Sequence, residues 1–162
     1  MTDSANDGAT LKARLRADLT TAMKARDTLT TGTLRLAIAA ITNAEVSGST
    51  ARELSDAEVM AVLNKEVRKR AEAAEAFSGA GRAEQAAKEE AEAAVLTGYL
   101  PKPLTDAEIN ALVGSAVGEV ATSTGAPVTM RQMGLVIKQV QAAAAGRADG
   151  SRISASVKAA LG

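Results

Sequence analysis

One short segment constrains the fold of this chain more than any other: residues 96–108, with the sequence LTGYLPKPLTDAE. No proline precedes it, and two of the three prolines in the chain, Pro101 and Pro103, lie within it. Each proline fixes its own φ angle and lacks an amide donor, so a helix that reaches this point has to end. A new helix start follows, because the side chains of Thr105 and Glu108 can cap each other's amides. The segment therefore predicts a stiff joint between a larger front domain and a smaller tail domain.

The predicted domains have definite bounds. Residues 1–9 are small and polar, and we expect them to be disordered. Residues 10–100 form the front domain and residues 105–162 form the tail domain, with a proline hinge at residues 101–104. A proline-containing joint is stiffer than a Gly/Ser linker, so it should hold the two domains at a more defined angle. The residues that define this hinge are Tyr99, Leu100, Pro101 and Pro103.

The composition favours helices over strands. Alanine, leucine, glutamate, lysine and arginine are abundant, all of which are good helix formers, and only Phe77 and Tyr99 are aromatic. Apolar residues also recur at helical spacing through most of the chain. We therefore predict an all-α fold, with four helices in the front domain and three in the tail domain.

The four front helices differ in how clearly the sequence marks them. A basic amphipathic helix begins near Leu11, and Asp27–Thr33 marks either a weak break or the start of the second helix. Ser55 and Glu58 form a capping-box pattern that opens a long third helix. In the fourth helix, the stretch 83–94 contains no large apolar residue, so it must either pack through alanine or stay in water.

In the tail domain, the apolar pattern predicts three further helices. The second of them, residues 129–144, should direct Met130 and Met133 into the core. Methionines at this spacing can also line a partner groove, but they are more often part of a core. The third helix should be capped by Ser151 or Ser154.

The residue types present exclude most catalytic chemistry. The chain has no Cys and no His, so it has no thiolate and lacks the commonest general base and the commonest metal ligand. We find no nucleophile–base pair and predict no catalytic residue, no cofactor and no metal. Glu89, Glu90 and Glu92 could be metal ligands, but an alanine-rich helix more often exposes such residues to solvent. Residues 146–150, GRADG, resemble an anion-binding loop only weakly, and a plain turn is favoured.

The sequence also gives an expectation about the cellular location of the protein. Residues 1–10 lack the positive and apolar regions of a secretory signal, and the chain contains no run of about 18 apolar residues. We therefore expect a cytoplasmic protein without membrane association. The oligomeric state is left open by the sequence.

The charge distribution makes the tail domain a candidate for phosphate contact. The chain has 19 basic and 19 acidic residues, but from residue 101 onward there are 6 basic residues and only 4 acidic ones. Unbalanced basic residues are the electrostatic mark of nucleic-acid binding. Because aromatic residues that stack on bases are nearly absent, any RNA contact should involve the backbone and the shape of the RNA. The tail candidates, for which phosphate contact and ordinary surface charge are equally open, are Lys138, Arg147, Arg152 and Lys158.

A second basic set lies in the front domain. Positions three and four apart on a helix are neighbours, so these residues share one side of the third helix. Glutamates follow closely in the sequence, which favours a salt-bridged surface over a strip of phosphate contacts. The front candidates are Lys65, Arg68 and Lys69, with Glu66, Glu72 and Glu75 as the expected salt-bridge partners.

Several segments resemble the GatB/YqeY family. The junction YLPKPLTDAE is similar to the Tyr-Leu-Pro junction of that family, and residues 18–27, DLTTAMKARD, with the following TLR resemble its opening signature. Residues 66–82, which include FSGAGR, resemble its long third helix and the break after it. Near the C-terminus, MGLVIKQV, GRADG and VK resemble its tail. The match begins at about Leu11 and covers nearly the whole chain in the family's order.

This resemblance implies a four-helix domain followed by a three-helix tail. The larger relatives are B subunits of the aspartyl/glutamyl-tRNA amidotransferase. In those subunits this module is a C-terminal appendage that helps to hold the tRNA, while the amidation and kinase chemistry lies in a separate catalytic domain. A free-standing member would keep the tRNA-handling part. The activity named for the family as a whole, a carbon–nitrogen ligase with glutamine as amido-N-donor, would belong to the full-length relatives. The implied partners are tRNA and an amidotransferase or an aminoacyl-tRNA synthetase.

The resemblance also points to particular residues. Lys138, Arg147 and Lys158 match tail positions expected to contact the tRNA backbone. Ile137 departs from the family, in which a Met is more usual before the lysine, and we interpret the change as a volume-conserving swap. We therefore expect a tRNA-binding or amidotransferase-associated module without an active site of its own. The alternative is a protein-interaction adaptor with no RNA role, which the net charge of zero and the alanine-rich stretch 82–98 favour.

Overall fold

The structure, a computed structural model, describes residues 8–162. Residues 1–7, where most of the predicted disorder of residues 1–9 falls, lie outside the described residues. The described part of the chain forms seven α-helices and one short 3₁₀-helix and contains no strand, which confirms the all-α prediction. The chain divides into two compact units, a front unit of Met1–Leu100 and a tail unit of Pro101–Gly162. No helix within residues 8–162 is both long enough and apolar enough to cross a membrane.

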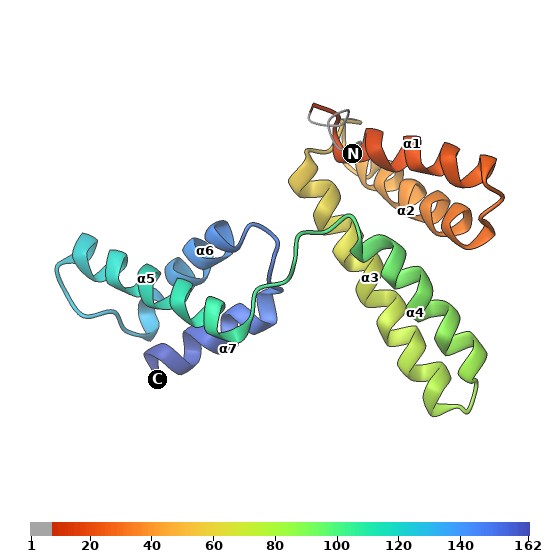
Figure 1. Cartoon of the computed structure of the whole chain (residues 1–162). Helices are drawn as coiled ribbons and strands as arrows, with labels where there is room; N and C mark the ends of the chain where they lie inside the picture. The colour runs from red at the N-terminus through yellow and green to blue at the C-terminus, as the bar shows by residue number, and fades with distance from the viewer. Residues whose placement is uncertain (1–7) are drawn as a thin grey trace, which may run out of the picture. The chain divides into compact units, whose positions relative to one another are not determined.

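The front unit contains four helices, which are α1 (Leu11–Lys24), α2 (Thr28–Val46), α3 (Asp56–Gly79) and α4 (Ala83–Thr97). They form two hairpins, α1 with α2 and α3 with α4 (Figure 1). The α3–α4 pairing is the most extensive one in the unit, and α2 contacts both of these helices. The second half of α3 and the first half of α4 form the closed end of their hairpin, and we call residues 70–92 the hairpin tip.

Side-chain caps explain where these helices begin. The hydroxyl of Ser55 accepts from the amide of Glu58 at 3.2 Å, and the Glu58 carboxylate accepts from the Ser55 amide at 2.8 Å. These two bonds confirm the predicted capping box at the start of α3. At α2 the carboxylate of Asp27 accepts from the amide of Thr30 at 3.0 Å. The segment that the sequence left open as a break or a helix start is therefore the start of α2.

The front unit has an aliphatic core. Its buried side chains come from α1, α2, the first half of α3 and the end of α4, and Tyr99 and Leu100 pack against them. Burying a leucine or isoleucine side chain in this way contributes about 1.5–3 kcal/mol. The buried members are Leu11, Leu15, Leu34, Ala37, Ile41, Val59, Leu63 and Leu96.

The hairpin tip is held together differently. Its buried apolar side chains are the alanines Ala74 and Ala86, so this stretch packs through alanine, one of the two alternatives that the sequence left open. Arg70 is only 6 % exposed. Its guanidinium donates to Glu66 one turn earlier at 2.9 Å and to Glu92 of α4 at 3.2 Å. The large buried side chain of the tip is thus an ion-paired arginine, whereas the large buried side chains of the front core are leucines and an isoleucine.

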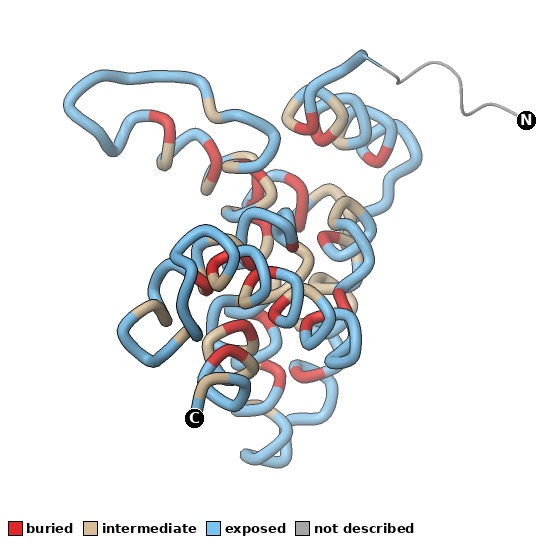
Figure 2. The backbone as a smooth tube through the Cα atoms, turned by 90° about the vertical axis from the view of Figure 1, so that its left-hand side faces the viewer, coloured by how far each residue is buried: buried red, intermediate tan, exposed pale blue. Residues whose placement is uncertain are grey.

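The tail unit contains α5 (Asp106–Thr124), the 3₁₀-helix η1 (Met130–Gln132), α6 (Met133–Ala144) and α7 (Gly150–Leu161). Each of its three α-helices packs against the other two. Buried positions recur about once per helical turn (Figure 2), as expected for helices that pack on one face. The buried core consists of Leu104, Ile109, Val113, Ala116, Val120, Val136, Val140, Ala144, Ile153 and Val157.

The predicted inward position of Met130 is wrong. This residue lies in η1, before α6 begins, and is 46 % exposed. A 3₁₀ turn is tighter than an α-helical turn, so Met130 does not follow the buried face of α6. Met133, the first residue of α6, does pack against the tail core, as predicted.

The predicted cap of the last helix is also wrong. Asp149, and not Ser151 or Ser154, is the N-cap of α7. Its carboxylate accepts from the amide of Arg152 at 3.0 Å, which satisfies one of the free amides at the helix start. Because the charged cap lies earlier than either serine, α7 begins at Gly150.

Candidate nucleic-acid interface

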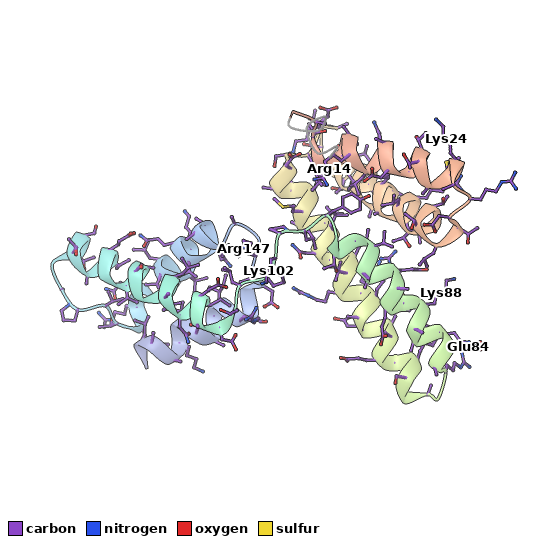
Figure 3. All side chains as sticks on the ribbon, in the orientation of Figure 1. Arg14, Lys24, Glu84, Lys88, Lys102 and Arg147 are labelled. Carbon is purple, nitrogen blue, oxygen red and sulfur yellow. The ribbon has the colours of Figure 1, made fainter. Side chains whose placement is uncertain are left out.

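Arg147, one of the four tail candidates, holds the start of the tail unit in place. Its Nε donates to the carbonyl oxygen of Lys102 at 2.9 Å, and its own carbonyl oxygen accepts from the amide of Leu104 at 2.8 Å. Figure 3 labels both residues, where the Arg147 side chain meets the backbone of Lys102. The turn between α6 and α7 is therefore joined to the segment before α5 by bonds in both directions.

Arg152, in the first turn of α7, binds the same segment. Its Nη1 donates to the carbonyl oxygen of Leu104 at 3.0 Å, and its Nη2 donates to a carboxylate oxygen of Asp106 at 2.5 Å. An arginine has five N–H donors, so both tail arginines keep donors that could reach a phosphate. Their positions, however, are set by these internal bonds.

The two tail lysines have different surroundings. Lys138 lies on α6 and Lys158 lies in the last turn of α7, and both are exposed. Within residues 8–162 neither ammonium group makes a hydrogen bond or an ion pair. The four tail candidates therefore divide into two arginines that bind protein atoms and two lysines that face solvent. In the described part of the chain, no hydrogen bond joins either lysine to either arginine, so hydrogen bonding does not hold the four candidates together as one cluster.

Three of the four acidic residues of the tail unit are held at helix starts. Asp106 binds Arg152, Glu108 completes the capping box of α5, and Asp149 caps α7. The hydrogen bond from the amide of Thr105 is the largest of the effects that hold the pKa of Glu108 below its usual value. Because the Asp149 carboxylate occupies the start of α7, residues 146–150 form a capped turn, in agreement with the plain-turn interpretation.

The front candidates lie on α3 among carboxylates. The Nζ of Lys69 lies 3.4 Å from a carboxylate oxygen of Glu66, as the salt-bridged interpretation predicts. Lys65 and Arg68 are exposed and make no ion pair in the described part of the chain. From residue 47 to residue 100 the sequence has 7 basic and 10 acidic residues, so this region is net negative and should attract a phosphate less than the tail unit does.

The glutamates of α4 do not form a metal site. Glu92 is bound to Arg70, and its other carboxylate oxygen lies 4.0 Å from the Nζ of Lys88. Glu90 lines a shallow hollow between α3 and α4. Among residues 8–162 no group of three or more acidic side chains is placed to hold a metal ion.

The predicted hinge residues are anchored to the front unit on one side. The hydroxyl of Tyr99 donates to a carboxylate oxygen of Asp18 on α1 at 2.6 Å, and the guanidinium of Arg14 lies 5.7 Å from the centre of the Tyr99 ring. Burial, and next the hydrogen bond to the Asp18 carboxylate, raise the pKa of the Tyr99 hydroxyl above its usual range. Leu100 packs against the front core, whereas Pro101 and Pro103 are exposed. The stiffness of this hinge stays a prediction.

Comparison with known proteins agrees with the resemblance that the residues show. A family model described as Yqey-like protein matches residues 12–161. The match begins in α1 and ends in α7, so it takes in both compact units. No curated protein matches the chain. Because the family model covers nearly all of the sequence, the chain belongs to the YqeY-like protein family.

Proposed function

We propose that this protein is a cytoplasmic helical module that binds tRNA through the sugar–phosphate backbone, either alone or in support of a tRNA amidotransferase. Two lines of support come from different sources. The resemblance to amidotransferase B subunits points to tRNA as the ligand, and the charges of the tail unit are suited to an anion.

The separation of charge in the tail unit is the observation that carries the proposal. Lys138 and Lys158 are exposed without partners in the described part of the chain, while Asp106, Glu108 and Asp149 are bound at helix starts. A lysine without a nearby carboxylate can replace a counterion on an RNA phosphate, which favours binding and makes it depend on salt.

The aromatic residues support contact with the backbone instead of the bases. Reading bases in single-stranded RNA relies on aromatic rings on which the bases stack. Tyr99 is already hydrogen-bonded to Asp18 and covered by Arg14, and Phe77 lies in the hairpin tip, in the net-negative region. Binding should therefore depend weakly on RNA sequence.

The proposed function includes no catalytic step. Releasing ammonia from glutamine requires an activated nucleophile, and the chain has no Cys and no His. A carbon–nitrogen ligase activity with glutamine as donor would then belong to a partner amidotransferase, and an aminoacyl-tRNA synthetase is the second partner class. Glutaminase activity in the purified protein would overturn this part of the proposal.

The test reverses the two exposed tail charges in the full chain, Lys138→Glu with Lys158→Glu. A fluorescently labelled tRNA is titrated with wild type and variant at about 50 mM and about 200 mM salt. Losing two phosphate contacts should weaken binding at low salt by roughly tenfold or more. It should also reduce the slope of the logarithm of affinity against the logarithm of salt concentration by about 1.5. Arg147 and Arg152 stay in place, because replacing them would also release the segment that they bind.

A matched control carries Lys65→Glu with Arg68→Glu on α3, which makes the same change in total charge. The proposal predicts that this control keeps most of the wild-type affinity. Unchanged binding in the tail variant would remove the tail unit from the interface. Equal losses in both variants would show that net charge, and not the tail surface, determines binding.

A protein-interaction adaptor with no RNA role is the second candidate. The observation that favours it is the alanine-lined hairpin tip, where Ala71 and Ala74 border the shallow hollow between α3 and α4. Small side chains let a partner helix approach closely. In a pull-down from a lysate, Ala87→Glu with Ala91→Glu should release the partners of such an adaptor. Partners that all stay bound would count against this candidate.

A further inference from the structure

The first two helices of the front unit carry an excess of positive charge. Residues 8–46 contain six basic and three acidic residues, whereas the rest of the unit is net negative. All three acidic side chains have hydrogen-bond or ion-pair partners within the unit, and none of those partners is Lys24, Arg26 or Arg35. The pairs are Asp18 with the Tyr99 hydroxyl, Asp27 with the amide and hydroxyl of Thr30, and Glu45 with Lys12.

Three of these basic side chains gather where α1 ends. Lys24 is the last residue of α1, and Arg26 follows in the connecting turn. Arg35 of α2 reaches the same place, because its Nη2 lies 3.7 Å from the sulfur of Met23. All three are exposed, and none has a carboxylate partner within residues 8–162. We call Lys24, Arg26 and Arg35 the α1–α2 basic corner; Figure 3 shows Lys24 at the opposite end of α1 from Arg14.

Arg26 occupies a backbone position that normally favours glycine. Its φ angle is +59°. Its amide donates to the carbonyl oxygen of Met23 at 3.2 Å, and the amide of Asp27 donates to that of Ala22 at 3.0 Å, which is the hydrogen-bond pattern of a Schellman helix end. Glycine meets this geometry without steric cost, so the turn itself does not require arginine. The arginine places a guanidinium just beyond the helix end, beside Lys24.

The carboxylate nearest in sequence to Arg26 is that of Asp27, and it does not pair with the arginine. The Asp27 side chain accepts from the hydroxyl of Thr30 at 2.6 Å and from its amide at 3.0 Å. These two hydrogen bonds hold the pKa of Asp27 below its usual value. The carboxylate thus stays charged but is directed at the start of α2, which leaves the guanidinium of Arg26 without a partner in the described residues.

We propose that the α1–α2 basic corner is a second phosphate-binding surface, one that contacts the sugar–phosphate backbone of a structured RNA. The inference rests on the proposed RNA-binding function, but it assigns a contact to the front unit that does not depend on the tail lysines. Two of the three residues are arginines, whose planar fork binds phosphate oxygens in a bidentate way. The absence of aromatic side chains at the corner favours the backbone over the bases.

The sharpest test replaces Arg26 by glycine in the full chain. Arg26→Gly removes the charge and relieves the positive φ, so thermal stability should stay the same or rise while affinity for a labelled tRNA transcript falls by about fivefold at about 50 mM salt. Arg26→Asn, which also tolerates this backbone, should lose the same affinity, and Arg26→Lys should keep most of it. Lost stability and lost affinity together in Arg26→Gly would overturn the assignment, because the arginine would then be structural.

A second variant removes the rest of the corner, Lys24→Gln with Arg35→Gln. When these two changes are combined with Arg26→Gly, the affinity should fall by about a hundredfold. The slope of the logarithm of affinity against the logarithm of salt concentration should become shallower by about 2 to 3. The control matched to Lys24→Gln with Arg35→Gln is Arg82→Gln with Lys88→Gln, which also removes two exposed cations, here from the hairpin tip, and should change the affinity by less than about threefold. An equal loss in the control would overturn the corner as a specific surface.

The outcomes separate this inference from the proposed function. Loss of binding in the tail variant alone would overturn the corner and leave the proposed tail interface standing. Loss in the corner variant alone would support the corner and remove the tail lysines. No binding of wild type to tRNA would overturn both. Vesicles containing anionic lipid are the remaining probe, and binding to them without binding to tRNA would assign the corner to a membrane surface and overturn the RNA assignment.

Discussion

The hairpin tip and the tail unit use similar residues in opposite ways. In the tip, the buried apolar side chains are Ala74 and Ala86, and the buried cation Arg70 donates hydrogen bonds to Glu66 and Glu92. In the tail unit, valines and isoleucines fill the core, and the lysines remain at the surface. The tip, which has a weak apolar core, thus buries an ion-paired arginine, whereas the tail unit, which has a full core, keeps Lys138 and Lys158 exposed at its surface.

The comparison also shows why the number of charges is a poor guide to a binding surface. The front unit as a whole holds 13 of the 19 basic residues, yet Arg70, Lys12 and Arg52 all bind carboxylates within it. The tail unit holds six basic residues, and its acidic partners are mostly fixed at helix starts. The positions of the carboxylates decide which cations can meet an anion.

The largest expected effect comes from breaking the ion-paired tip. Arg70→Leu would remove the buried cation of Glu66 and Glu92, whose side chains are 13 % and 15 % exposed, and leave them only the exposed lysines Lys69 and Lys88. The free energy of unfolding should fall by about 3–5 kcal/mol, as for other buried pairs that lose one partner. Urea denaturation measures the loss. Adding Glu66→Gln and Glu92→Gln should recover most of it, and a single variant as stable as wild type would show that alanine packing alone holds the tip.

The next effect tests the aliphatic core of the tail unit. Ile153 is 1 % exposed, and Ile153→Ala should cost about 3 kcal/mol, against about 1 kcal/mol for the control Ile153→Val. Amide hydrogen exchange should accelerate in α5, α6 and α7 while the amides of α3 and α4 keep their protection. Acceleration of the same size in both units would mean that they unfold together and that the contrast between them does not extend to stability.

A smaller effect concerns the end of the front unit. Tyr99→Phe removes the hydroxyl that donates to Asp18 at 2.6 Å and should lower the free energy of unfolding by about 1 kcal/mol. The ring and its contact with Arg14 remain in this variant, so the change reports the hydrogen bond. Denaturant titration beside Asp18→Asn, which keeps an acceptor and should cost less, separates the bond from the charge. Identical stability of Tyr99→Phe and wild type would rule out an energetic role for this contact.

The smallest effect is a pH dependence in the front unit. The side-chain hydrogen bonds from Arg52, followed by the bond from the Ser55 amide, lower the pKa of Glu58 to about 2 from its usual 4.5. A carboxylate with a lowered pKa stabilises the folded state fully above its unfolded pKa, and this stabilisation is lost as the pH falls from about 4.5 to about 2. Glu58→Gln should lack this part of the pH profile. Profiles of the same shape in both proteins would contradict the role of the Arg52 pair.

The fold was largely predictable because local signals and apolar spacing agree. The capping pairs at Ser55 and Thr105 mark helix starts directly, and the helical period identifies the buried faces. The two errors, Met130 and the cap of α7, lie next to short turns. There a 3₁₀ turn, or a charged side chain two residues before the expected serine, shifts the start of a helix.

The contacts of the candidate site were less predictable. Arg147 and Arg152 stood out as unbalanced charges, but their partners include the backbone carbonyl oxygens of Lys102 and Leu104, 45 and 48 residues away. No sequence pattern reports such a pairing, because every residue has a carbonyl oxygen. The α1–α2 basic corner was hidden for a related reason, since its formation depends on α2 folding back along α1 to bring Arg35 beside Met23.

The salt dependence of tRNA binding by the full wild-type chain is the first measurement to make, because backbone contact through exposed cations requires it. The protein is titrated with labelled tRNA at several salt concentrations between about 50 mM and about 300 mM, and the logarithm of the affinity is plotted against the logarithm of salt. Contact through exposed cations predicts a straight line with a slope of about −2 or steeper. No binding at the lowest salt, or binding that does not change with salt, would rule out a tRNA interface built on exposed lysines and arginines.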